Sequence, residues 1–123
     1  MAWELKSDRP IYSQLIEQIE IRICSGIYAP GSKLPSVREL AQEAAVNPNT
    51  MQKALSIMEE AGLVYTNRTS GRFITEDANM IQQAKQKLAQ DQISEFLEKM
   101  KSLGFGKTET LSLISTMLEE AKK

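Results

Sequence analysis

The 123-residue sequence contains no histidine and only one cysteine, Cys24. Histidine is the commonest general base and the commonest metal ligand, so its absence removes the usual chemistry of acid–base and zinc enzymes. A phosphate-binding loop, a serine nucleophile elbow and a dinucleotide-binding fingerprint are also lacking. We therefore expect a protein that is not an enzyme and that uses no metal and no cofactor.

Long apolar runs are missing as well. No stretch approaches the roughly 20 residues that span a bilayer, and the start, MAWELKSDRP, has no apolar signal-peptide core. We expect a cytoplasmic protein with no membrane partner. Cys24 lies among Ile21, Ile23 and Ile27, which predicts a buried and unreactive thiol.

Neither sign of charge is in excess. Lysine and arginine number 15, aspartate and glutamate 16, and the net charge is −1. Such a total does not favour a nucleic-acid partner, so the placement of the charges matters more than their sum. Charged residues at 25% and hydrophobic residues at 41% indicate a globular chain rather than a disordered one.

Apolar residues recur at helical spacing through the first half of the chain. They predict a helix at about 10–26 that ends at Gly26, a second at about 36–44 and a third at about 48–61 that ends at Gly62. Two short helices joined by the tight turn between them form a helix-turn-helix.

Local signals mark where the second and third helices begin. In SVRE, residues 36–39, Ser36 and Glu39 can each bond to the other's backbone and form a capping box. In VNPNT, residues 46–50, Asn47 is the expected N-cap and Pro48 the first helical residue, where its missing N–H costs nothing.

The third helix carries a polar stripe opposite its apolar face. Asn49, Gln52, Lys53 and Ser56 follow the spacing i, i+3, i+4, i+7, and none of them is acidic. Amide side chains suit adenine edges, and lysine suits guanine or phosphate. An ordinary solvated face is the alternative explanation, although such a face usually mixes both charge signs.

Two strands are expected after the third helix, at 63–66 and 72–75, with a hairpin loop at 67–71. The stretch from Ala61 to Thr75 contains no acid but includes Arg68 and Arg72. A helix-turn-helix followed by a basic hairpin is a winged helix, whose wing can contact phosphates or enter the minor groove. A hairpin with no such role is the alternative.

Two more helices are expected, at about 78–103 and 107–121, with Gly106 as N-cap of the second and Glu109 reaching back to it. Two helices cannot enclose a core, so their apolar stripes must be buried on the first domain, on a second copy of the chain, or on both. We predict a mainly α fold with a small β-wing, in which residues 1–77 form the winged helix-turn-helix and 78–123 a two-helix dimerisation tail. The expected dimer interface consists of Ile93, Phe96, Leu97, Met100, Leu111, Ile114 and Leu118.

GIYAPGSKLPSVRELA, residues 26–41, resembles the signature of GntR-type bacterial transcription regulators. The following helix and GLV at 62–64 fit as well, and IYSQLIEQI and VNPNTMQKAL resemble the YtrA-like branch, whose members carry a short two-helix tail. The resemblance implies a winged-helix domain and a homodimer formed largely by the tail. The leading hypothesis is a repressor that binds an inverted-repeat operator in double-stranded DNA.

The resemblance also implies DNA-contacting positions: Arg38, residues 47–50 and 52, and the wing-tip residues 68 and 69. Two departures from the family pattern occur, because many members have arginine where Pro48 stands and a wing glycine where Thr69 stands. Together with the residues singled out above, the expected DNA-binding set is Ser36, Arg38, Asn47, Asn49, Thr50, Gln52, Lys53, Arg68, Thr69, Gly71 and Arg72.

A winged-helix module that binds another protein is the alternative function, and the near-neutral charge favours it slightly. The roughly 45 residues after Asp77 are too few to enclose a pocket like those of larger regulators. The sequence therefore identifies no small-molecule effector.

Overall fold

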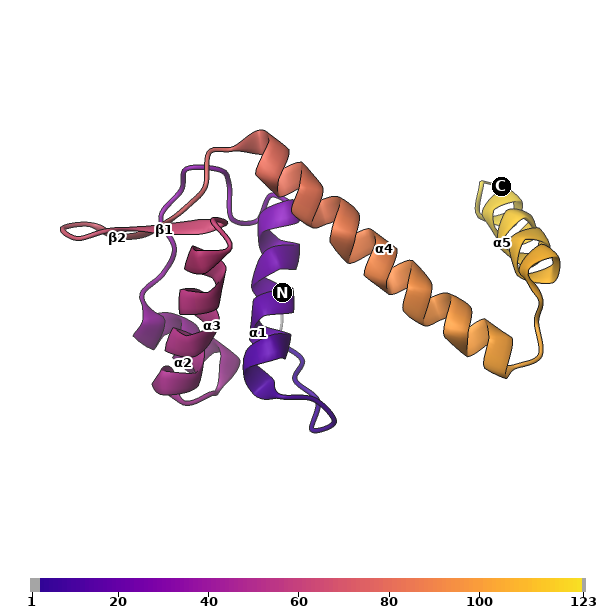
Figure 1. Cartoon of the computed structure of the whole chain (residues 1–123), viewed down its shortest axis with the longest axis horizontal. Helices are drawn as coiled ribbons and strands as arrows, with labels where there is room; N and C mark the ends of the chain where they lie inside the picture. The colour runs from indigo at the N-terminus through magenta and orange to yellow at the C-terminus, as the bar shows by residue number, and fades with distance from the viewer. Residues whose placement is uncertain (1–2, 123) are drawn as a thin grey trace. The chain divides into compact units, whose positions relative to one another are not determined.

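A computed structural model describes residues 3–122 (Figure 1). The chain forms two compact units, Met1–Gln86 and Lys87–Lys123. The architecture is mainly helical with one two-stranded antiparallel sheet, which confirms the predicted fold class. The first unit includes the first turns of α4, whose side chains pack on its core.

Three helices build the core of the first unit: α1 (Ile11–Cys24), α2 (Val37–Ala44) and α3 (Pro48–Glu60). Each turns one apolar stripe inward, as the helical spacing predicted. The stripes meet in one cluster in which the largest side chains are no more than 2% exposed. They are Leu15, Ile19, Ile23, Leu40, Met51, Leu55 and Met58.

Both predicted helix starts are confirmed. The Glu39 backbone N–H donates to Ser36 Oγ at 3.1 Å, and the Ser36 N–H donates to Glu39 Oε1 at 3.2 Å, which completes the capping box of α2. At the start of α3, Asn47 Oδ1 accepts from the Asn49 N–H at 2.8 Å, and Pro48 is the first helical residue. Both caps satisfy N–H groups that have no partner within their helix.

The wing consists of β1 (Val64–Asn67) and β2 (Gly71–Ile74), which extend from the helices as a narrow hairpin (Figure 1). Val64 and Ile74 pair at its base and are buried in the core. The connector before α2 also joins the hairpin, since Lys33 forms a β-bridge with Phe73. The sequence did not predict this third segment, because a single bridge has no alternating pattern.

The beginning of α4 (Ala78–Ser102) belongs to the first unit. Met80, Ile81 and Ala84 pack against its core. The Cys24 Sγ donates to the Ile81 carbonyl at 3.9 Å, and burial raises the pKa of the Cys24 thiol. Cys24 is therefore poorly ionised, as expected of an unreactive thiol, but it is half-buried rather than fully buried.

The second unit contains the rest of α4 and α5 (Lys107–Ala121). The Gly106 N–H donates to Glu109 Oε1 at 3.1 Å, so the predicted start of α5 is confirmed. Among the described residues of the second unit, Met100 and Thr110 are buried. Thr110 Oγ1 donates to the Gly106 carbonyl. Within residues 3–122, no helix is long and apolar enough to cross a membrane.

Ala45, in the turn between α2 and α3, generates a stability prediction. It has a left-handed backbone, φ 57° and ψ 47°, although it carries a Cβ. An L-residue in this region costs roughly 1–2 kcal/mol, whereas glycine adopts it freely at an entropic cost of about 0.4–1 kcal/mol. We expect Ala45→Gly to raise the free energy of unfolding by about 0.5 kcal/mol, measured by urea denaturation.

The neighbouring residue Ala44 supplies the control. It is helical and 4% exposed, so Ala44→Gly should destabilise the fold by about 1 kcal/mol. Equal losses of stability in the Ala44→Gly and Ala45→Gly variants would contradict the left-handed turn.

Candidate nucleic-acid interface

The outward face of α3 is the polar stripe predicted from the sequence. Because Met51, Leu55 and Met58 are buried, Asn49 and Gln52 project from the opposite side and are exposed. Gln52 Nε2 donates to Ser56 Oγ at 3.2 Å, so this amide is oriented along the helix. The stripe presents hydrogen-bonding groups over two turns and contains no acid.

Lys53 lies at the edge of this stripe. Its Nζ sits 3.9 Å from the centre of the Tyr12 ring on α1. A cation–π contact at an exposed site is worth about 0.5–1 kcal/mol, so it holds the ammonium group only weakly. Lys53 can leave the ring for a phosphate or a base edge at little cost.

Asn47 and Thr50 lie beside the stripe, around the start of α3. Together with Trp3, Leu5 and Ile11 they line a shallow hollow of about 490 Å³ against the N-terminal segment. The Oδ1 of Asn47 is occupied by the helix cap, which leaves its amide NH₂ group as the donor available to a partner.

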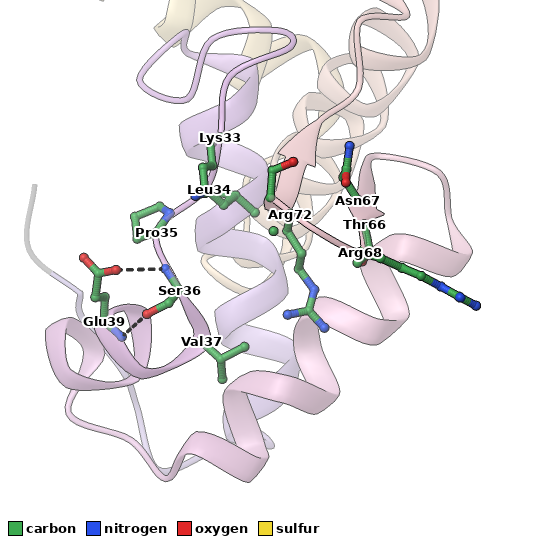
Figure 2. Close-up of a pocket in the computed structure, with 12 residues that line it drawn as sticks. Lys33, Leu34, Pro35, Ser36, Val37, Glu39, Thr66, Asn67, Arg68 and Arg72 are labelled. Atoms are coloured by element: carbon green, nitrogen blue, oxygen red, sulfur yellow. Dashed lines mark hydrogen bonds between the residues drawn. The ribbon is translucent and has the colours of Figure 1, made fainter.

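A groove of about 460 Å³ separates the start of α2 from the wing (Figure 2). The side with α2 carries Ser36, and the other side carries Arg68 and Arg72. Figure 2 shows the side chain of Arg68 extending outward from the hairpin. Arg38 is exposed in the first turn of α2 and, in the part of the chain described, forms no ion pair.

Lys33 is a cation in this groove that the sequence analysis missed. The signal was weak because Lys33 lies in a turn-rich connector, outside both the helix-turn-helix and the hairpin. In the structure its Cε would lie 3.1 Å from a Cβ placed on Gly71, whose φ is +107°. Gly71 therefore permits both the backbone turn and the close approach of Lys33 to the wing.

Arg72 has a partner inside the protein. Its Nε donates to Glu59 Oε1 at 2.6 Å, and Thr66 Oγ1 donates to the same oxygen at 2.5 Å. The Arg72 and Glu59 side chains are 20% and 30% exposed. The hydrogen bond from Thr66, followed by the hydrogen bond and charge of Arg72, lowers the pKa of Glu59 against the opposing effect of burial.

The wing tip is organised by Asn67. Its Oδ1 accepts hydrogen bonds from both the N–H and the hydroxyl of Thr69, at 3.0 and 2.9 Å. The Thr69 hydroxyl is thus used within the turn, whereas the exposed Arg68 forms no ion pair among residues 3–122. Arg68 is the charged group that the tip presents to solvent.

The residues expected at a dimer interface lie in the second unit, and most are exposed. The exposed fraction is 41% for Phe96, 44% for Leu97 and 66% for Leu111. Ile93 and Leu118 are also exposed, Ile114 is half-buried, and Met100 is 9% exposed because it packs inside the unit.

Residues 11–74 match the family described as bacterial regulatory proteins, gntR family. The chain is 43% identical over 116 residues to the uncharacterized HTH-type transcriptional regulator YhcF of Bacillus subtilis, covering 94% of this chain and 96% of YhcF. It is 39% identical over 93 residues to the HTH-type transcriptional repressor YtrA of the same organism, covering 75% and 72% of the two chains.

Solved structures of regulators superpose on this chain over most or part of its length. A GntR family transcriptional regulator from Listeria monocytogenes superposes with a TM-score of 0.82 at 36% identity, covering 91% of this chain and 98% of the other. AraR(DBD) in complex with operator ORE1 superposes with a TM-score of 0.53 at 31% identity, covering 61% and 94% of the two chains.

The Glu59 cluster generates a pH-dependent prediction. Because the pKa of Glu59 is lowered in the folded protein, its ionised form stabilises the fold above the pKa of an unfolded glutamate, about 4.3. This contribution is lost as the pH falls through the lower folded pKa. We expect Glu59→Gln to reduce the free energy of unfolding at neutral pH by about 1 kcal/mol, with the deficit shrinking below about pH 4.

Urea denaturation across this pH range measures the effect. Glu60→Gln is the matched control, since Glu60 is exposed and has no side-chain partner among the described residues. A deficit of equal size for both variants at neutral pH would show that the Glu59 contacts contribute nothing.

Proposed function

The chain belongs to the GntR family of bacterial regulatory proteins, and we propose that it acts as a homodimeric repressor on an inverted-repeat operator. It is a transcription regulator with a winged-helix DNA-binding domain, and it fits the YtrA-like branch. The observation that carries the proposal is the acid-free polar stripe of α3 beside a groove whose lining includes Lys33, Arg68 and Arg72 and one acid, Glu39. The name of YtrA, a repressor, supports the direction of regulation.

In the proposed complex α3 enters the major groove, which is wide enough for a helix. Asn49 and Gln52 read base edges, because their amide groups match the donor and acceptor pattern of adenine. Lys53, released from Tyr12, reaches a guanine or a phosphate. The acids at the end of α3 stay clear of the bases, because recognition helices contact bases with their N-terminal residues.

Phosphate contacts come from the two sides of the groove between α2 and the wing. On the α2 side, Ser36 and Arg38 lie in or next to the first turn, where backbone N–H groups also favour an anion. On the wing side, Arg68 and Lys33 supply positive charge. These contacts orient the protein on the duplex without reading sequence.

Dimerisation through the second unit completes the proposal. Eight large apolar side chains there are at least 40% exposed: Ile93, Phe96, Leu97, Leu103, Leu111, Leu113, Met117 and Leu118. Burying one such side chain is worth roughly 1.5–3 kcal/mol, so a second copy is the simplest cover. A two-fold dimer presents two α3 helices to two half-sites of an inverted repeat.

A protein-binding module is the second candidate function, favoured by the net charge of −1. Salt dependence separates the two. A gel-shift titration with duplexes selected from a random-sequence pool tests the proposal, and we expect sequence-specific binding that weakens steeply with salt. Failure to enrich any sequence would contradict the proposed function.

Base reading by α3 gives the next prediction. Asn49→Ala should cost on the order of 1–3 kcal/mol on the selected duplex and little on random DNA, because a base contact acts only on the correct sequence. Arg38→Ala is the comparison: loss of a phosphate contact should weaken both duplexes alike and lower the salt slope by about one unit. If Asn49→Ala weakened binding to both duplexes equally, Asn49 would not be a base-reading residue.

Assembly gives a further prediction. Phe96→Asp places a charge among exposed apolar side chains and should convert a dimer at micromolar concentration to a monomer with weak binding to the selected duplex. Gln90→Asp, at an exposed position on the same helix, controls for the added charge. Sedimentation velocity provides the measurement, and a wild type that is monomeric yet binds tightly would overturn the dimer.

A further inference from the structure

We propose that Glu59 is a positioning residue that fixes the wing relative to α3, so that Arg68 and the base-reading face of α3 engage one duplex together. The inference rests on the proposed function, because it concerns how the same protein grips DNA. It assigns a role in binding to an acidic residue that stays clear of the DNA in the proposed complex.

The contact geometry links three elements through one carboxylate oxygen. Glu59 lies in the last turn of α3, and its Oε1 accepts from Thr66 on β1 and from Arg72 on β2. Thr66 and Arg72 are cross-strand partners in the hairpin register. Glu59 therefore holds both strands of the wing at the same level.

This is the level at which the wing bonds to α3. Toward the core, Val64 and Ile74 are buried, and at the level of the Thr66–Arg72 pair the Leu34 N–H donates to the Arg72 carbonyl at 2.9 Å. Beyond the Thr66–Arg72 pair, residues 67–71 are all exposed, and the side chain of Lys33 approaches Gly71. A two-stranded hairpin is marginally stable by itself, so the direction of the tip depends on these contacts.

A positioning role and a purely electrostatic role for Glu59 predict opposite effects on DNA binding when the residue is replaced. An acid in a DNA-binding unit repels phosphates, so its removal alone should strengthen binding. Glu60 tests that expectation because it is the next residue, is exposed, and has no side-chain partner in the described chain. If Glu59 positions the wing, removing Glu59 weakens DNA binding, whereas removing Glu60 does not.

The experiment measures binding of full-length variants to a duplex that the wild type enriches from a random-sequence pool. We expect Glu59→Ala to weaken binding about tenfold, because the wing tip loses its alignment with α3. Glu60→Ala should leave binding unchanged or strengthen it slightly. Stronger binding by Glu59→Ala would overturn the proposal.

A double-mutant cycle with Arg68 supplies the readout that a purely structural role would not give. In an Arg68→Ala background, where the tip has already lost its charge, Glu59→Ala should cost less than half of its effect in the wild type. An undiminished effect would show that Glu59 acts on the fold and not through the wing, and would also overturn the proposal. Circular dichroism checks that each variant is folded at the assay temperature.

The outcomes distinguish this inference from the proposed function. If the wild type enriches no sequence from the pool, the proposed function fails before the Glu59 comparison begins. If the wild type binds its selected duplex and Asn49→Ala abolishes the preference, the function stands. In that case the Glu59 cycle alone decides the inference.

Discussion

Burial of one face of α3 is the constraint on which the rest of the structure depends. Met51, Ala54, Leu55 and Met58 are no more than 1% exposed, and together they fix the rotation of the helix against its neighbours. When one face of a helix is buried, the face on the other side of the helix is left in solvent. The rotation of α3 therefore also decides which of its side chains are exposed. The same packing that stabilises the domain thus selects the polar stripe to which we assign base reading.

The wing depends on this helix in turn, and the dependence explains why a net charge of −1 is compatible with binding DNA. Glu59 faces the wing and pairs with Arg72, so its charge is compensated within the protein. Lys33, Arg38 and Arg68, which form no ion pair within residues 3–122, lie in the groove between α2 and the wing or next to it. Local arrangement, rather than total charge, sets the potential that a phosphate meets.

Local patterns predicted the elements well, because caps, periodicity and turns act over a few residues. The Ser36 capping box and the Asn47 cap needed only neighbours within three positions. The contacts that were missed join segments far apart in sequence: Lys33 with Phe73, and Arg72 with Glu59. From the sequence, Arg72 was expected to bind DNA, because no local pattern identifies an ion-pair partner on another element.

Cross-linking tests most directly whether α3 lies next to bases in the complex with DNA. In a Cys24→Ser background, a photoreactive group is attached to Gln52→Cys on α3 or, as a control, to Gln83→Cys, which is exposed on α4. The account predicts cross-links from position 52 to bases at two symmetric places in the selected duplex, and none from position 83. A stable complex in which position 52 reaches no base would contradict it.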